Sequence, residues 1–181
     1  MRIISGTHKG RRITPPRNLP VRPTTDMAKE ALFNILGNRL YFEETKILDL
    51  FAGTGNISFE FASRGSREIT SIDQHPGCVK FINEKAAEWG LPIRARRMDV
   101  FKYLETTSGK YDLILADPPY GISLEDFQKI HSQVFERGLL APGGILIIEH
   151  SKQTDLSHLE NATEIRQYGN SRFSFFEEKK E

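Results

Sequence analysis

The chain has 181 residues, of which 38% are hydrophobic and 27% charged, and its formal net charge is +1. This composition predicts one soluble globular domain, and we expect neither a signal peptide nor a membrane span, because no long apolar stretch occurs. A single cysteine, Cys78, excludes an internal disulfide and suits a cytoplasmic protein, and the five histidines lack metal-ligand spacing, so we expect no metal site.

The basic side chains are concentrated at the start of the chain. Residues 1–25 hold six of the 25 basic residues and no acidic one, which leaves 19 basic against 24 acidic residues in the remainder. The six are Arg2, Lys9, Arg11, Arg12, Arg17 and Arg22. A basic arm on an acidic body is suited to contact a phosphate backbone, although a solvated tail would have the same composition.

The expected elements alternate along most of the chain. Two short strands are predicted around Gly6 and Gly10, then a proline-rich connector, and then a helix that begins after Thr24-Thr25-Asp26 and ends near Gly37. The predicted strands are 47–50, 69–73, 94–98, 111–116, 144–149, 163–168 and 172–176, and the helices between them are 57–64, 76–89, 100–104 and 124–135.

This order predicts an α/β fold with a Rossmann-like, doubly wound sheet of seven mostly parallel strands and helices on both faces. The last two strands, joined by Gly169-Asn170-Ser171, should form an antiparallel hairpin at one edge. We expect a basic N-terminal extension with hairpin and helix character over residues 1–25, and a single main domain over residues 26–181.

A glycine-containing loop follows the first main strand, with the sequence Asp49-Leu50-Phe51-Ala52-Gly53-Thr54-Gly55-Asn56. Glycines let the backbone approach a ligand, and the next helix directs its N-terminus at it. The third glycine of a dinucleotide fingerprint is replaced by Ser58, which argues against an NAD-dependent oxidoreductase.

Four aspartates lie at or near the ends of successive predicted strands, namely Asp49, Asp73, Asp99 and Asp117. One such aspartate is often only a helix cap or turn residue. Four on one rim, beside the glycine loop, predict a ligand crevice in which Asp73 would bind ribose hydroxyls and Asp99 an adenine amine.

The segment Asp117-Pro118-Pro119-Tyr120 ends the fourth main strand. The prolines stop the strand and stiffen the turn, so that an acid, a backbone carbonyl and an aromatic ring are presented together. Asp117 and the Pro118 carbonyl would accept the hydrogens of an exocyclic amine while Tyr120 stacks on the base. An ordinary strand exit with a packing tyrosine is the alternative interpretation.

The glycine loop and the Asp117–Tyr120 segment together resemble S-adenosylmethionine-dependent methyltransferases that act on a nucleobase amine. Other stretches resemble, more narrowly, the bacterial small-subunit (16S) ribosomal RNA guanine-N2 methyltransferase family, the RsmD family. These stretches are residues 1–6 with 9–11, residues 22–26 leading into 30–36, residues 49–55, and residues 168–171. Thr54, where that family often has serine, and Asp73, where it often has glutamate, depart from the pattern conservatively.

The resemblance implies S-adenosylmethionine as cofactor and ribosomal RNA as substrate, with methylation at guanine N2 by a monomer. It implies a cofactor site of Arg22, Thr24, Asp49, Phe51, Gly53, Gly55, Asp73, Asp99 and Asp117, and a catalytic loop of Asp117, Pro118, Pro119 and Tyr120. For Arg22 and Thr24, a phosphate contact or helix capping is the alternative. RNA would contact Arg2, Lys9, Arg11, Arg12 and Arg17, with Tyr168 and Asn170 beside the base unless they serve only the hairpin turn.

Two other functions stay open from the sequence. A DNA adenine-N6 methyltransferase shares the Asp117–Tyr120 motif, but the chain has no segment to spare for a DNA-recognition region. A non-catalytic RNA-binding module with the same fold would have no need of the acid at position 117.

Overall fold

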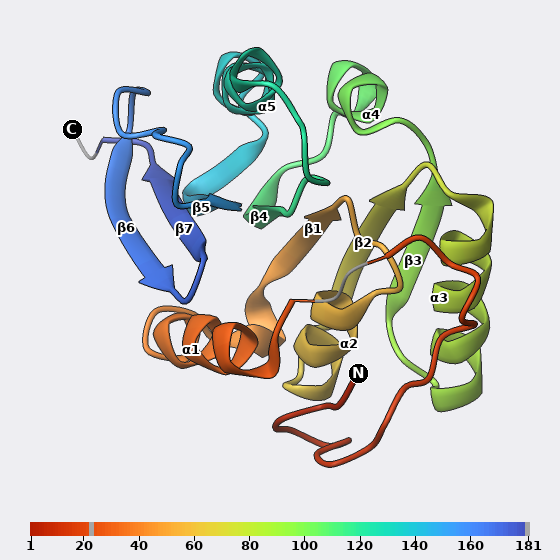
Figure 1. The fold of residues 1–181 in the computed structure, drawn as a ribbon. Coiled ribbons are helices and arrows are strands. Elements are labelled where there is room, and N and C mark those ends of the chain that lie inside the picture. The colour runs from red at the N-terminus through yellow and green to blue at the C-terminus, as the bar shows by residue number, and fades with distance from the viewer. Residues whose placement is uncertain (22–23, 180–181) are drawn as a thin grey trace.

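The structure is a computed structural model that describes residues 1–21 and 24–179. In this part of the chain a seven-stranded sheet has the order β3-β2-β1-β4-β5-β7-β6 (Figure 1). The strands are β1 (Lys46–Leu50), β2 (Glu68–Asp73), β3 (Ile93–Arg97), β4 (Tyr111–Ala116), β5 (Leu140–Ser151), β6 (Ala162–Tyr168) and β7 (Ser171–Glu177). The helices are α1 (Asp26–Gly37), the 3-10 helix η1 (Phe42–Glu44), α2 (Asn56–Ser63), α3 (Pro76–Trp89), α4 (Val100–Thr106) and α5 (Leu124–Glu136).

The predicted fold class is confirmed. Strands β3, β2, β1, β4 and β5 are parallel, and β7 pairs antiparallel with both β5 and β6. The chain order reverses between β1 and β4, which is the switch point where doubly wound sheets bind ligands. The prediction missed η1, and it made β5 too short because Pro142-Gly143-Gly144 has the composition of a turn.

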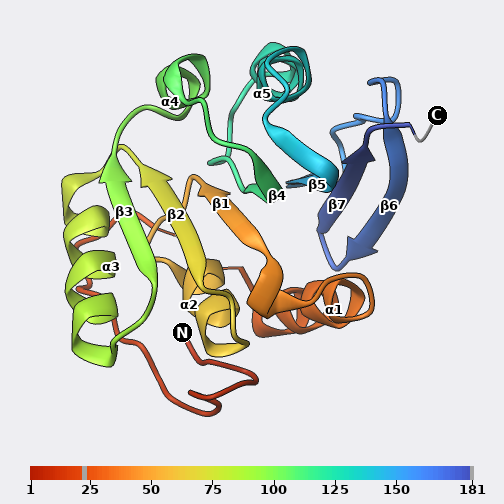
Figure 2. The same ribbon diagram turned by 180° about the vertical axis from the view of Figure 1, so that it is seen from behind.

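Helices cover both faces of the sheet (Figures 1 and 2). Strand β1 shows how alternation separates the two cores: Ile47 belongs to the cluster under α1–α3, and Leu48 and Leu50 belong to the cluster under α4 and α5. The same alternation directs Asp49 toward α2, into a position that is only 2% exposed.

The N-terminal arm, defined as residues 1–13, packs against the main domain. Its two predicted strands are reduced to a single antiparallel bridge between Arg2 and Arg12. Ile3 and Ile13 are 2% and 1% exposed and belong to the core cluster under α1–α3. The arm passes beneath α2, and the chain then rises beside α3 toward the carboxyl ends of the strands (Figure 1). The division at residue 25 stays a prediction.

A buried charge network fastens the arm to two helices. Lys29 of α1 and Glu60 of α2 are 1% and 0% exposed, and the Lys29 Nζ lies 3.3 Å from Oε1 of Glu60. The Glu60 carboxylate also accepts from the backbone N–H groups of residues 4–5, at 2.9 and 3.1 Å, and from Arg64 Nε at 2.8 Å. Lys29 donates in turn to the carbonyl oxygen of Arg2 at 2.6 Å. Burial lowers the pKa of Lys29, and the Glu60 carboxylate opposes that shift.

Candidate active site

A cavity of about 1020 Å³ lies along the carboxyl ends of the parallel strands. Residues that follow β1, β2, β3, β4 and β5 line it, together with the β6–β7 turn and residues 20–21 of the connector. The cavity therefore spans the switch point between β1 and β4.

Most of the predicted site residues meet at this cavity. Those that line it are Thr24, Asp49, Phe51, Gly53, Asp73, Asp99, Asp117, Pro118, Pro119, Tyr120 and Asn170. Tyr168 instead packs against Phe173, with ring centroids 6.1 Å apart, and does not line the cavity. Arg22 lies outside the described residues.

The glycine loop is held in its shape by packing and by Asp73. Gly55 has φ 86°, and a Cβ on it would come within 2.9 Å of both Phe59 and Ile82, so no other residue fits there. Asp73 accepts a hydrogen bond from the Gly53 N–H and another from the His75 N–H, both at 2.9 Å. Asp73 thus organises two loops, and its remaining lone pairs can still accept from a ligand.

The connector, residues 14–21, lies against the glycine loop before α2 and against the first turn of α3. A Cβ on Gly53 would lie 3.3 Å from Cγ1 of Val21, and one on Gly77 would lie 2.6 Å from Cδ2 of Leu19. The backbone at these two glycines therefore lies directly against the connector. The connector forms part of the cavity wall through Pro20 and Val21, whereas the sequence had indicated only Arg22 and Thr24, which follow it.

Phe51 holds a strained backbone conformation in the cavity wall. Its φ of 58° lies in the left-handed region, which costs a residue with a side chain about 1 kcal/mol or more. Its ring packs edge-on against Phe101, with centroids 6.4 Å apart. Phe51 and Phe101 both line the cavity.

Asp49 is a buried carboxyl with a hydroxyl partner. Ser58 donates to its Oδ2 at 2.6 Å, and the hydroxyl groups of Ser58 and Ser71 lie 2.7 Å apart. Burial raises the pKa of Asp49 to about 7, and the nearby charge of Asp73 adds to that shift. Ser58, interpreted from the sequence only as a missing glycine, thus provides the hydrogen bond that stabilises a buried acid.

Replacing Asp49 by asparagine should change how stability depends on pH. Between about pH 4 and pH 7 the folded protein keeps this proton while the unfolded chain, with the ordinary pKa of 3.8, has lost it. The stability that Asp49 contributes is therefore full below pH 4 and is lost as pH rises through 7, at up to about 1.4 kcal/mol per pH unit.

Urea unfolding of both proteins across this range would test the prediction. The free energy of unfolding of Asp49→Asn should improve relative to the wild type as pH rises from about 5 to 7. Two parallel stability curves would show that Asp49 titrates normally.

A second carboxyl group, absent from the sequence prediction, stands beside Asp117. Ala116 pairs with Ile148 in the sheet, so the next residues lie side by side, Asp117 just beyond the end of β4 and Glu149 still within β5. The Thr24 hydroxyl oxygen lies 3.3 Å from Oδ2 of Asp117 and 3.3 Å from Oε2 of Glu149. Glu149 ends the predicted strand 144–149, so the rule that found the four aspartates could have found it.

The two carboxyl groups influence each other's titration. Burial raises the pKa of Asp117 well above its usual range, and the charge of Glu149 and a hydrogen bond with it raise that pKa further. A carboxyl–carboxyl hydrogen bond requires a proton, because two carboxylates are both acceptors. Titration therefore belongs to the pair.

Asp99 and Tyr120 were both predicted to contact a ligand, and the structure shows what surrounds each of them. Asp99 is exposed and caps α4, with Oδ1 accepting from the Lys102 N–H at 3.1 Å, so the capping alternative is realised. It also borders the cavity. Tyr120 is 72% exposed and lines the same cavity, so its ring is accessible to a flat ligand.

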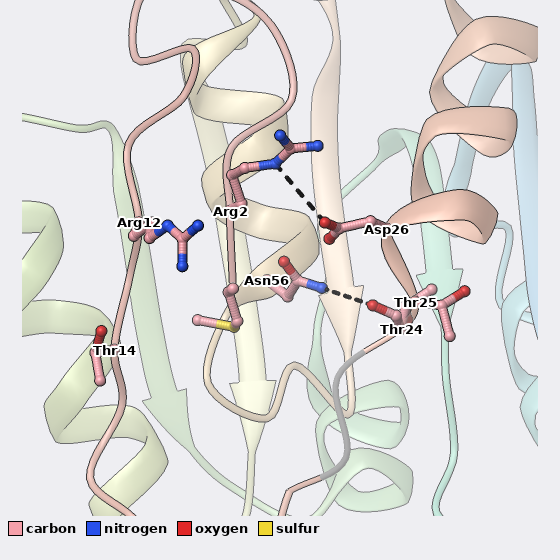
Figure 3. Close-up of a pocket in the computed structure, with 8 residues that line it drawn as sticks. Arg2, Arg12, Thr14, Thr24, Thr25, Asp26 and Asn56 are labelled. Carbon is pink, nitrogen blue, oxygen red and sulfur yellow. Dashed lines mark hydrogen bonds and ion pairs between the residues drawn. The ribbon is translucent and has the colours of Figure 1, made fainter.

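A second pocket, of about 490 Å³, adjoins the cavity on the side of the arm (Figure 3). Arg2 and Arg12 border it, and Thr24, Thr25 and Asn56 border both spaces. Lys29 donates to Oδ1 of Asn56 at 2.9 Å, and Nδ2 of Asn56 donates to the carbonyl oxygen of Thr24 at 3.2 Å. Asn56 thus connects the buried charge network to the cavity wall.

The predicted RNA-contacting side chains of the arm and connector are exposed, but some have partners. Arg2 forms an ion pair of 3.7 Å with Asp26, and the guanidinium of Arg11 lies 5.0 Å from the centre of the Trp89 ring. Lys9, Arg12 and Arg17 are exposed as well.

Across residues 1–21 and 24–179, no group of three or more His, Cys, Asp or Glu side chains is arranged to hold a metal ion. In the same residues, no helix combines the length and apolarity that crossing a membrane requires.

Comparison with known proteins gives a consistent result. The family model described as "Conserved hypothetical protein 95" matches residues 1–177. The Haemophilus influenzae protein named "Ribosomal RNA small subunit methyltransferase D" is 28% identical, over 92% of this chain and 87% of that protein. A Thermus thermophilus "hypothetical protein" of known structure has a TM-score of 0.82 and 27% identity, over 98% of this chain and 99% of that one.

A more distant structure shares the fold. The RNA methyltransferase from Salinibacter ruber, solved in complex with S-adenosyl-L-homocysteine, has a TM-score of 0.65 and 19% identity, over 86% of this chain and 92% of that one. The resemblance seen in the sequence is thereby confirmed at the level of family, and the chain belongs to the RsmD-like family described as conserved hypothetical protein 95.

Proposed function

We propose that this protein is an S-adenosylmethionine-dependent ribosomal RNA methyltransferase that methylates the N2 amine of a guanine in the small-subunit RNA. The observation that carries the proposal is that the Asp117–Tyr120 loop and the glycine loop after β1 open into one cavity. The name of the Haemophilus influenzae relative supports the ribosomal RNA substrate. The guanine N2 position rests on the sequence resemblance. Action as a cytoplasmic monomer stays a prediction.

The half of the cavity beside β1, β2 and β3 fits the cofactor. The loop at Gly53 brings bare backbone to the cavity wall, and Asp73 offers carboxylate lone pairs for ribose hydroxyls. Phe51 and Phe101 would provide apolar surface for the adenine ring, and Asp99 would accept from its amine. When bound, S-adenosylmethionine supplies an electrophilic methyl group on a positively charged sulfur.

The other half of the cavity would hold the acceptor base. The lone pair of a guanine amine is delocalised into the ring, so the amine is a poor nucleophile and alignment matters most. Asp117 and the Pro118 carbonyl accept its two hydrogens, which orients the nitrogen and stabilises the positive charge that develops there. The raised pKa of Asp117 suits it to take the released proton.

The target guanine has to leave its stack to enter this cavity. Exposed Tyr120 would stack on the extruded base, as aromatic side chains do in single-stranded RNA recognition. Asn170, on the β6–β7 turn, borders the same space. The basic arm would hold the phosphate backbone on the adjoining face.

Methyl transfer from labelled S-adenosylmethionine to small ribosomal subunits, or their free RNA, from cells lacking the protein would test this function. Label should appear on N2 of one guanine, located by mass spectrometry of nuclease fragments. Label on DNA adenine would favour the DNA methyltransferase alternative. Cofactor binding without transfer to either nucleic acid would favour the non-catalytic RNA-binding module.

Neutralising the basic side chains of the arm and connector should weaken RNA binding in a salt-dependent way. We expect Lys9→Gln, Arg12→Gln and Arg17→Gln together to reduce the slope of log K against log salt. The reduction should be roughly 0.7 for each phosphate of single-stranded RNA that is no longer neutralised. Deleting the arm would be a poor test, because Glu60 would lose its backbone donors.

The matched control replaces three exposed lysines elsewhere, Lys80, Lys129 and Lys179, by glutamine. This control lowers the net charge by the same amount as the first triple variant. Its slope of log K against log salt should stay close to that of the wild type. Equal slopes for the two triple variants would mean that Lys9, Arg12 and Arg17 contact no phosphate.

A further inference from the structure

The acceptor half of the cavity contains a second carboxyl group that the proposed reaction has not yet used. Glu149 is half-buried, lines the cavity, and approaches the same Thr24 hydroxyl as Asp117, at 3.3 Å in each case. Its place is set by the sheet, since β4 and β5 are paired up to Ala116 and Ile148. Two acceptor groups are therefore fixed next to each other on the wall from which the Asp117–Tyr120 loop departs.

The bases differ in what they present beside the exocyclic amine. Guanine has the N1–H donor next to its N2 amine. Adenine and cytosine have instead an unprotonated ring nitrogen, which is an acceptor, next to theirs. An amine-binding acid alone accepts hydrogens from all three bases, whereas a second acid at the neighbouring position meets a donor only in guanine.

We propose that Glu149 is a specificity-determining residue that accepts the N1–H of the target guanine while Asp117 and the Pro118 carbonyl hold the N2 amine. The inference rests on the proposed function and names the group that selects guanine within it. Adenine or cytosine in the same place would bring a ring-nitrogen lone pair against an acid-lined wall, and a buried mismatch of this kind is strongly disfavoured.

The electrostatics of Asp117 and Glu149 agree with this role. Burial raises the pKa of Asp117, and the adjacent carboxyl group of Glu149 raises it further. Guanine brings two neighbouring donor groups, one for each acid. Charge-assisted hydrogen bonds of this type are about twice as strong as neutral ones.

The test compares guanine with 2-aminopurine at the mapped target nucleotide, in whichever RNA or particle is methylated. 2-Aminopurine keeps the N2 amine but has no hydrogen on N1. The wild type should favour guanine in kcat/KM by roughly tenfold to a hundredfold, the range for removing one hydrogen bond to a charged group. In Glu149→Gln the preference should fall toward one, because an amide can donate to N1 of 2-aminopurine.

A control variant distinguishes a loss of specificity from a general loss of activity. Glu136→Gln changes an exposed glutamate at the end of α5, away from the cavity lining, and should keep the wild-type ratio of the two substrates. A preference in Glu149→Gln equal to that of the wild type would overturn the inference, as would a wild type that uses both bases equally. A wild type that labels no guanine would overturn the proposed function itself.

Discussion

Replacing Asp117 by alanine is expected to lower the rate of methyl transfer by roughly 10²- to 10⁴-fold while the affinity for S-adenosylmethionine changes little. The acid both fixes the amine and stabilises charge that appears only in the transition state, and such groups typically contribute rate factors of this size. Its place on the far side of the switch point from Asp73 and Asp99 explains why cofactor binding should survive.

Single-turnover kinetics and calorimetric titration of the cofactor, on the same preparations, would measure the two effects separately. Asp117→Asn should be intermediate, because its amide oxygen still accepts from the amine but cannot take a proton. Glu125→Ala, at an exposed position on α5, is the control and should retain the wild-type rate. Full activity of Asp117→Ala would eliminate the catalytic role given to this residue.

The largest expected effect on stability concerns Lys29. Its replacement by methionine should lower the free energy of unfolding by about 3–5 kcal/mol, because Glu60 would keep a buried charge with only Arg64 to balance it. The Arg2 carbonyl and the Asn56 side chain would also lose a donor. The arm should therefore loosen together with the global loss of stability.

Urea unfolding with a matched surface pair as reference would measure this effect. Lys80 and Glu84 form an ion pair on α3 with side chains 76% and 68% exposed, and Lys80→Met should cost less than about 1 kcal/mol. Similar losses for the two lysine variants would show that the buried network contributes no more than an exposed pair.

Much of the fold could be predicted because local signals agreed with the tertiary structure. Helix α3 was predicted to the residue, since Pro76 occupies its first turn and Gly90 closes it. Strand β4 was also predicted to the residue, because its apolar run ends at the Asp117 turn. The aspartates of the rim could be found because parallel strands place their carboxyl ends on one edge.

The remaining features depend on pairs of residues that are distant in sequence. Nothing local indicates that Lys29 reaches Glu60, and an amphipathic helix normally leaves a lysine in water. Helix capping was only the alternative interpretation of Thr24, and Thr25 caps α1 instead. Thr24 meets Asp117 and Glu149, which are 93 and 125 residues away. Such contacts follow from tertiary packing alone.

The connector has a consequence for how this protein can vary. Loops generally accept insertions and deletions, because their length is not fixed by what they contact. Here Leu19 and Val21 each pack closely against a glycine, Gly77 in the first turn of α3 and Gly53 in the loop before α2. The number of residues between these two contacts is therefore fixed by the structure. Related proteins should show as few insertions and deletions in this surface segment as in a core strand.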